Sequence, residues 1–403
     1  MKLPSSAASW FVLSRRLAGD RVFVAAWIVT FLTNVAWGLI FPLRNLYIRD
    51  AGVPLALIGT ISTAGMLSFN LAGLAFGWLS DTTGRRRLLI AGSLLASVLI
   101  MAAYLWAGAY WHFLLLQILD LAMIGCYVTL VSARVTALFP TQEQGRGFGL
   151  YRISGSFGFA LASLSLGLVT TSFGVRSIFA FGAVAYFLAF GASLVLHGDR
   201  PARRETSQAA PKVNILRIPG LIWFFVASIL AGTGQYMVFP FFPIYLRDVL
   251  SASDGQIGLV STIGVLSEVP AMLYLGALSD RLGRRPVLNL IFILETVRWF
   301  ALYTTPILGL VFVIQVLAGI SQARYTLSTV FMSDLVPYEQ RATVLGLQQL
   351  VVGVGMVIAP TLGGFVAEAA GVRSIFAVAG LMGGAAIPLF NLTTLLRRNH
   401  ASR

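Results

Sequence analysis

The sequence is poor in charged residues, which make up only 11% of its 403 positions. A soluble globular domain keeps about a quarter of its residues charged, so this chain does not have the composition of one. Apolar residues account for 57% of the chain, and its mean hydropathy is +0.83. The composition therefore predicts a protein that lies largely within a lipid bilayer.

Cysteine and histidine are also scarce. Cys126 is the single cysteine and lies inside an apolar run, so it indicates neither a disulfide nor a metal site. His112, His197 and His400 are far apart in the sequence, and no nucleophile motif or phosphate-binding loop accompanies them. We therefore expect a protein that is not an enzyme, holds no metal or organic cofactor, and is not driven directly by ATP.

Long apolar segments fill most of the chain. A helix needs about 20 apolar residues to cross the hydrocarbon core, whereas membrane barrels use alternating segments of about ten residues. Twelve segments match the helical length: 23–48, 55–79, 88–108, 111–137, 148–171, 175–196, 219–246, 255–278, 287–305, 307–335, 343–368 and 373–396. The sequence predicts an all-α polytopic membrane protein with twelve transmembrane helices.

Basic residues are unevenly distributed between the two predicted sides of the membrane. If the N-terminus is cytoplasmic, the cytoplasmic segments and adjoining helix ends hold 22 of the 29 Lys and Arg residues. The outer side then keeps only Arg49, Arg176, Arg247 and Arg373. Cytoplasmic loops of membrane proteins carry an excess of Lys and Arg, so both termini are predicted to be cytoplasmic. The same distribution argues against a nucleic-acid partner, despite the net charge of +14.

Four landmarks occur twice, in the same order and about 199 residues apart. They are "GWLSDTTGRRR" (77–87) with "GALSDRLGRRP" (276–286), "FPLRNLYIRD" (41–50) with "FPFFPIYLRD" (239–248), "GVRSIFA" at 174–180 and 371–377, and Pro140 with Pro337. The repeat predicts two homologous six-helix bundles, parallel because each contains an even number of spans. We assign 1–196 to the N-terminal bundle, 197–218 to a cytoplasmic central loop and 219–403 to the C-terminal bundle.

The layout G-x-L-S-D-x-x-G-R-R, after the second and again after the eighth predicted helix, resembles the major facilitator superfamily of secondary transporters. The resemblance covers essentially the whole chain. It implies two bundles that rock about a central site by alternating access. It also implies a small-molecule substrate, coupling to an ion such as the proton, and a location in a bacterial inner or plasma membrane. We expect a monomer.

The repeated hairpins are the candidate gating motif. Their residues are Gly77, Asp81, Gly84, Arg85 and Arg86, and Gly276, Asp280, Gly283, Arg284 and Arg285. The first glycine of each would let a neighbouring helix approach, the acid would pair with a basic group or a helix N-terminus, and the second glycine would permit a tight turn. In similar proteins the acid latches one half to the other in the outward-open state. The alternative is that these charges only fix the topology.

Six ionisable residues lie inside predicted spans: Arg44, Asp120, Glu268, Glu295, Arg298 and Arg324. A charge at mid-membrane costs about 2.5–3.5 kcal/mol on insertion scales, so each one needs a reason. In the resembling family, the first, fourth, seventh and tenth helices line the central cavity, which places Arg44, Asp120 and Arg324 toward the substrate path. We expect Asp120 or Glu268 to carry the proton, with Arg324 as counter-charge or substrate anchor. The alternative is a static salt bridge.

The remaining expectations concern single positions. Glu295 and Arg298 are predicted to pair at i, i+3 on a peripheral helix. Pro270 is expected to bend or break its helix, and Pro42, Pro240 and Pro243 to mark bends near the outer helix ends. Further candidates for the substrate cavity, each with helix–helix hydrogen bonding as the alternative, are Asn34, Trp37, Gln235 and Tyr236.

The leading functional hypothesis is proton-coupled efflux of an amphipathic organic molecule. Two departures from drug antiporters weaken the proton-antiport part: Gln117 stands where an arginine is expected, and 155–167 contains no proline. The second hypothesis is a proton-coupled uptake symporter for a sugar, a nucleoside or an organic acid. A remote third is a membrane sensor that does not transport.

Overall fold

The computed structural model describes residues 17, 19–139, 144–196, 220–336 and 340–401. Every regular element within these ranges is helical, in agreement with the predicted all-α class. The predicted central loop 197–218, the first sixteen residues, and the Pro140 and Pro337 landmarks lie outside the described residues.

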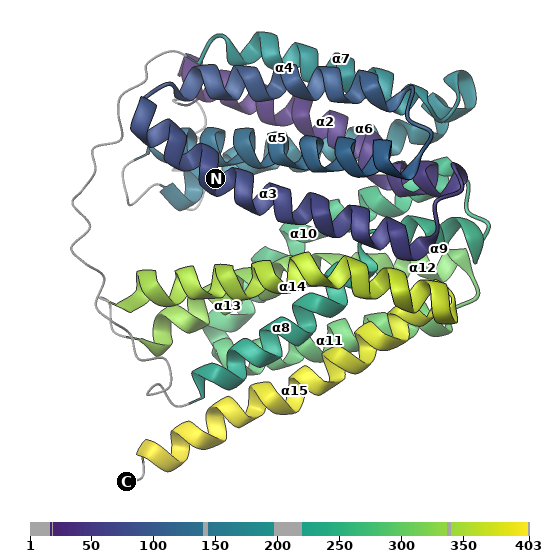
Figure 1. The fold of residues 1–403 in the computed structure, drawn as a ribbon. Coiled ribbons are helices and arrows are strands. Elements are labelled where there is room, and N and C mark those ends of the chain that lie inside the picture. The colour runs from purple at the N-terminus through teal and green to yellow at the C-terminus, as the bar shows by residue number, and fades with distance from the viewer. Residues whose placement is uncertain (1–16, 18, 140–143, 197–219, 337–339, 402–403) are drawn as a thin grey trace, which may run out of the picture. The chain divides into compact units, whose positions relative to one another are not determined.

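The helices of the first repeat follow one another with short connections (Figure 1). They are α2 (Arg21–Asp50), α3 (Leu55–Thr83), α4 (Arg86–Tyr104), α5 (Tyr110–Thr136), α6 (Gln144–Phe173) and α7 (Ser177–Ser193). Helix α4 packs against both α5 and α7. Aromatic side chains fill part of this core, where Tyr104 stacks on Phe179 with ring centroids 4.7 Å apart.

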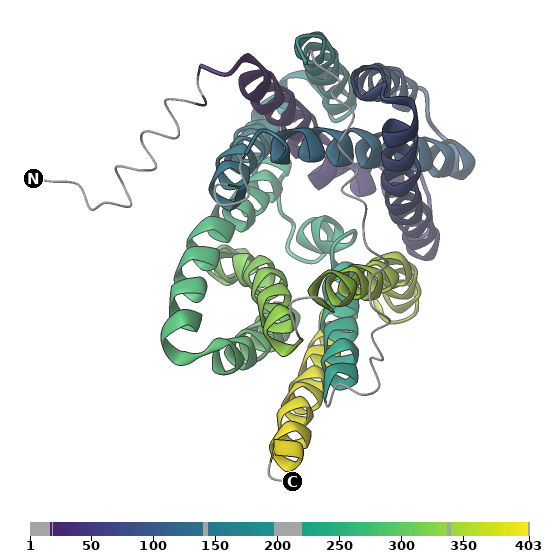
Figure 2. The same ribbon diagram turned by 90° about the vertical axis from the view of Figure 1, so that its left-hand side faces the viewer.

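The second repeat has two interrupted helices. Its elements are α8 (Leu221–Val238), α9 (Phe242–Asp248), α10 (Asp254–Leu282), α11 (Arg284–Thr304), α12 (Leu308–Gln315), the 3₁₀ helix η2 (Val316–Gly319), α13 (Ile320–Leu335), α14 (Arg341–Ala370) and α15 (Ser374–Ala401). Helix α8 packs on α14 and α15, and both views show α8 beside α15 (Figures 1 and 2). Phe224, Phe331 and Phe390 pack together at the centre of this group.

The chain divides into two compact units, each of which consists of three stretches of the sequence. The first unit covers Met1–Tyr47, Ala64–Arg203 and Asp254–Thr262, and the second covers Ile48–Thr63, Arg204–Ser253 and Ile263–Arg403. The end of α2 and the start of α3 therefore belong to the second unit, and the start of α10 belongs to the first. The division of the chain into bundles at the central loop stays a prediction.

Eleven helices of the described chain are long and apolar enough to cross a membrane. In this count α12, η2 and α13 form one span, Leu308–Leu335. Helix α7 is also apolar but has only 17 residues. Each of the twelve predicted segments overlaps one of these helices, so the multi-span, all-α architecture is confirmed. The sixth predicted segment, 175–196, forms a helix that is shorter than predicted.

Proline acts differently at the four predicted bends. Pro240 stands in the break between α8 and α9, and Pro243 lies in the first turn of α9, where a missing N–H is tolerated. Pro42 and Pro270 lie inside α2 and α10, which continue past them to Asp50 and Leu282. Pro270 therefore does not break its helix.

The repeated heptapeptide GVRSIFA forms the same corner in both halves. Gly174 and Gly371 directly follow the last residues of α6 and α14, and each donates its N–H to a helical carbonyl at 2.9 Å. Ser177 and Ser374 each donate their hydroxyl to the carbonyl of that glycine at 2.6 Å. The same sequence therefore forms the same two corner hydrogen bonds in both halves, which is local evidence that the halves are structural repeats.

Candidate functional site

A buried ion pair joins α2 and α5 inside the first unit. Arg44 Nη1 lies 3.0 Å from Asp120 Oδ2, and the two side chains are 4% and 1% exposed. The Arg44 guanidinium also lies over the Trp37 ring, 5.3 Å from its centroid, and Trp37 stacks on Phe41. The structure thus brings together Arg44, Asp120 and Trp37, three residues that the sequence places on cavity-lining helices. The Phe41 ring lies beside them, stacked on Trp37.

The Asp120 carboxylate is only partly satisfied. Among the described residues, Asp120 Oδ1 has no hydrogen-bond partner, and the same holds for Arg44 Nε. One turn earlier on α5, the buried Gln117 side chain accepts a hydrogen bond from the Tyr104 hydroxyl at 3.1 Å. Arg44 is the one described cation that pairs with the Asp120 carboxylate.

A second buried ion pair lies in the second unit, between α11 and α13. Arg324 Nε is 2.8 Å from Glu295 Oε2, and Arg324 Nη2 donates to Gln235 Oε1 on α8 at 3.0 Å. The Glu295 and Arg324 side chains are both less than a tenth exposed. Within its own unit the ion-pair partner of Arg324 is Glu295, and the expected role of Arg324 as counter-charge or substrate anchor stays a prediction.

The predicted pairing of Glu295 with Arg298 is an electrostatic attraction rather than a direct ion pair. Arg298 donates from Nη2 to Gln315 Oε1 on α12 at 3.0 Å and lies over the Trp299 ring, 4.4 Å from its centroid. Positions three apart on a helix are neighbours on its surface but point about 60° apart around its axis. Glu295 can therefore reach α13 while Arg298 reaches α12.

The other predicted cavity residues are less closely tied to these pairs. Asn34 donates to the Thr30 carbonyl of its own helix at 2.9 Å, so its contact does not join two helices. Tyr236 and Glu268 are half-buried in α8 and α10. Glu268 has an interaction with the rest of the chain, whereas its role as a proton carrier stays a prediction.

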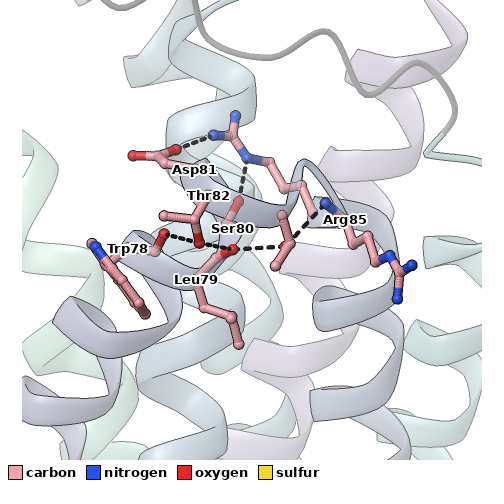
Figure 3. Close-up of polar contacts among 8 residues, drawn as sticks. Trp78, Leu79, Ser80, Asp81, Thr82 and Arg85 are labelled. Atoms are coloured by element: carbon pink, nitrogen blue, oxygen red, sulfur yellow. Dashed lines mark hydrogen bonds and ion pairs between the residues drawn. The ribbon is translucent and has the colours of Figure 1, made fainter.

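The first hairpin closes on itself at the end of α3. Arg86 donates from Nη2 to Asp81 Oδ1 and from Nε to the Ser80 hydroxyl, both at 3.1 Å, as the dashed lines in Figure 3 show. Asp81 is 55% exposed, and Arg85 is also exposed. Gly84 makes the turn with a φ of +68°. The expected pairing of the acid with a basic group is present in this hairpin.

The second hairpin has a wider set of charges. Arg284 lies 3.7 Å from Asp280 within the hairpin and 2.5 Å from Asp334 at the end of α13. Gly283 turns with a φ of +89°, and Arg285 is half-buried with an interaction of its own. This hairpin is therefore tied to the rest of its unit through Arg284.

The first glycines of the hairpins do not have the predicted role. A Cβ at Gly77 would lie 3.8 Å from Thr129 Cγ2, an ordinary contact, and one at Gly276 would meet no described atom within 4 Å. The close approach is one turn earlier, where a Cβ at Gly73 would lie 3.0 Å from Thr129 Oγ1. Helix α3 thus meets α5 nearer the middle of the span than the hairpin motif indicates.

Replacing Gly84 with alanine should lower the free energy of unfolding by about 1–2 kcal/mol, because an L-residue is strained at positive φ. Space is not limiting, since nothing lies within 4 Å of the new Cβ. Gly92→Ala is the matched control: it lies in open space inside α4, and alanine is the better helix former there, by up to about 1 kcal/mol. Opposite shifts of the two melting temperatures in detergent are expected, and equal shifts would contradict the turn strain.

Comparison of the sequence with known protein families identifies the family of this chain. The MFS_1 like family matches the chain over residues 26–378, which include all of α3 to α14. The chain is a major facilitator superfamily transporter. Members of this superfamily are secondary transporters rather than enzymes, so the chain is an integral, multi-pass membrane protein of a transporter family.

Curated relatives of this major facilitator protein are bacterial. The multidrug resistance protein MdtG of Enterobacter lignolyticus is 27% identical over 283 residues, which are 66% of this chain and 66% of the relative. MdtG of Klebsiella pneumoniae is 28% identical over 277 residues, 65% of this chain and 66% of that protein. The aligned part is thus slightly less than two thirds of each relative's length.

Solved structures share the fold at lower identity. The crystal structure of the nucleoside transporter NupG has a TM-score of 0.76 and 17% identity, covering 93% of this chain and 98% of its own. An inward-facing, occupied structure of a bacterial homologue of the human lysosomal transporter Spinster has a TM-score of 0.73 and 14% identity, covering 93% and 96%. These similarities show that the chain has the major facilitator fold.

Two features of this major facilitator protein have little signal in the sequence. The 3₁₀ helix η2 interrupts the tenth span just before Arg324, where the Gly319 N–H donates to the Ser267 hydroxyl at 2.9 Å. A Cβ at Gly319 would lie 2.2 Å from the Ser267 carbonyl oxygen, so the backbones meet directly. The second feature is the Glu295–Arg324 pair. The equal numbers of acidic and basic residues in the predicted spans indicate that pairs exist, but not which residues form them.

Proposed function

We propose that this transporter couples proton movement to the export of an amphipathic organic molecule. The observation that carries the proposal is the Arg44–Asp120 pair, buried, flanked by Trp37, and with one carboxylate oxygen lacking a partner among the described residues. An acid held by a single cation can exchange that cation for a proton when the helices move. The neighbouring aromatic rings suit a largely apolar substrate.

The relatives support the direction of transport. Several are multidrug resistance proteins, and such a name fits export of chemically varied, amphipathic compounds. In the proposal, Asp120 is the proton carrier, Glu268 is the second candidate acid, and Asn34, Trp37 and Tyr236 contribute to the cavity. The hairpin acids Asp81 and Asp280 act in gating on the cytoplasmic side.

A second candidate function is uptake of a polar solute with a proton. Its support is the hydrogen-bonding set of Glu295, Arg324 and Gln235 in the second unit, which would suit a sugar, nucleoside or organic acid better than an apolar molecule. A site built on hydrogen bonds discriminates strongly against ligands that leave its polar groups unpaired.

Flux into or out of proteoliposomes under an imposed pH gradient tests the proposal. With amphipathic dyes as probes, we expect transport of the dye against the proton flow, and loss of gradient dependence in Asp120→Asn. Accumulation of a nucleoside, sugar or organic acid along the proton gradient would favour the second candidate. Unchanged gradient-driven transport in both Asp120→Asn and Glu268→Gln would contradict proton coupling through these acids.

A further inference from the structure

Three buried tyrosines of the first unit extend from Asp120 toward the predicted cytoplasmic ends of the helices. Tyr186 lies in the middle of α7, and its ring centroid is 6.4 Å from that of Tyr127 on α5. Tyr127 follows Asp120 by seven positions, so the two residues share a face of α5 and are about 10 Å apart along its axis. Tyr151 lies near the start of α6. All three side chains are buried, and the proposed function gives none of them a role.

Polar interactions connect these tyrosines one after another. The Tyr186 hydroxyl interacts electrostatically with the Asp120 carboxylate and with the Tyr127 hydroxyl. Tyr127 interacts in turn with Thr33 on α2 and with Tyr151. The Thr33 hydroxyl donates to a carbonyl of its own helix at 3.1 Å, so its oxygen can still accept a proton from a neighbour. Four helices of one unit thus contribute to a single polar group.

This group ends where the side chains become partly exposed. Tyr151 interacts with the hydroxyls of Thr30 and Ser132, which are both half-buried. Its neighbour Arg152 is exposed, and α6 begins only seven residues earlier, at Gln144. The polar group therefore leads from a carboxylate that is 1% exposed to the predicted cytoplasmic part of the same unit.

Two buried polar atoms at the start of the group lack a direct partner. Within the ranges that the structure describes, neither Asp120 Oδ1 nor the Tyr186 hydroxyl forms a hydrogen bond. One is an acceptor and the other is a donor, and buried groups of this kind are normally satisfied by ordered water where no side chain reaches them. Tyr104 is equally buried, at 0% exposure like Tyr186, but its hydroxyl has a direct partner in Gln117.

We propose that buried water joins Asp120 to Tyr186, and that Tyr186, Tyr127 and Tyr151 conduct protons between this carboxyl and the predicted cytoplasmic side. The neutral carboxyl gives its proton to the water, which passes a proton to the Tyr186 oxygen. Each hydroxyl accepts one proton and releases its own to the next, and the last proton goes to water at the helix ends. Only O–H bonds break and form, and the carboxylate that remains pairs with Arg44.

The path rests on the proposed function, because it requires Asp120 to carry the proton. It adds the positioning residues through which that proton leaves. A path through hydroxyls also holds the charge of the proton away from the surrounding apolar side chains, where an isolated ion would be costly.

Hydroxyl-radical footprinting tests for the water without any substrate. Radicals that X-ray radiolysis produces from a bound water oxidise the side chain beside it, and mass spectrometry measures the modified fraction. In the full-length protein in detergent, we expect oxidation of Tyr186 and none above background at Tyr104, which is equally buried and directly hydrogen-bonded. Oxidation of Tyr186 no faster than that of Tyr104 would show a dry site and overturn the proposal.

Removal of single hydroxyls tests the path itself. In proteoliposomes with ethidium as the probe, transport driven by a pH gradient should fall about tenfold in Tyr186→Phe and in Tyr127→Phe, which corresponds to a barrier higher by about 1.4 kcal/mol. Exchange of labelled for unlabelled ethidium without a gradient needs no net proton movement and should be unchanged. Tyr104→Phe is the matched control: its hydroxyl also interacts electrostatically with Asp120, but it lies outside the path, so both rates should be unchanged.

The outcomes separate the path from the proposed function. Normal gradient-driven transport in both tyrosine variants, with loss in Asp120→Asn, refutes only the path, even where footprinting finds the water. A loss in Tyr104→Phe equal to that in Tyr186→Phe also refutes it, because polarity around the carboxylate would then explain the effect. Gradient-driven transport that persists in Asp120→Asn refutes the proposed function instead. The footprinting comparison needs no transport and decides on the water whether or not the proposed export is correct.

Discussion

Replacing Arg44 with methionine should abolish proton-driven transport and lower the free energy of unfolding by about 3–5 kcal/mol, because it leaves the Asp120 carboxylate buried without its cation. The carboxylate is 1% exposed, so water cannot replace the lost partner without rearrangement of the bundle. The change in stability is measured by thermal or chemical unfolding in detergent, and transport by flux under a pH gradient.

The double variant Arg44→Met and Asp120→Asn separates structure from function. It removes both charges, so most of the lost stability should return, since a neutral buried pair carries no desolvation penalty for an unpaired ion. Proton-driven transport should stay absent, because the titratable carboxyl is gone. If the double variant recovers both stability and gradient-driven transport, the pair is a static salt bridge and the proton is carried elsewhere.

Removing one partner of the Glu295–Arg324 pair should have a similarly large effect. Arg324→Met leaves Glu295, which is 4% exposed, without its ion pair, and we expect unfolding to become easier by about 3–5 kcal/mol. The same change takes a donor from Gln235 on α8. Because three helices lose a shared contact, the loss should appear as a lower melting temperature of the whole protein.

A double-mutant cycle identifies the partner of Glu295. The coupling between Glu295→Gln and Arg324→Met should be about 2–3 kcal/mol and should exceed the coupling between Glu295 and Arg298, which form no direct ion pair. The matched cycle uses Arg298→Met, which changes the same type of residue on the same helix as Glu295. A coupling to Arg298 that equals or exceeds the coupling to Arg324 would restore the i, i+3 interpretation and contradict the pairing described here.

The sequence predicts the architecture of this protein far better than its contacts. The length of the apolar segments, the basic residues of the loops and the repeated hairpins can be recognised from short stretches of sequence. The bilayer accounts for the first two, because its thickness sets the length of a span and cytoplasmic loops favour Lys and Arg. The repeated segment "GVRSIFA" is an example, because its helix end and serine contacts lie within a few residues of one another. Such features can be inferred without knowing how distant helices pack.

The site depends on which helices face each other, and the sequence says little about this. The direct ion-pair partner of Asp120 is Arg44, and that of Glu295 is Arg324 rather than its neighbour Arg298. The sequence predicts that acids and bases in the spans pair, but it does not say which residues meet. An unpaired charge in the membrane must find a partner, but several arginines satisfy that requirement equally well until the packing is known.

The short helix α7 has a consequence for the surrounding membrane. Its 17 residues extend about 26 Å at the rise of an α-helix, whereas the hydrocarbon core is about 30 Å thick. A span shorter than this thickness is accommodated by local thinning of the bilayer or by flanking side chains that reach to the headgroups. If α7 is the twelfth span that the sequence predicts, we expect the lipid layer beside it to be thinner than along the rest of the perimeter.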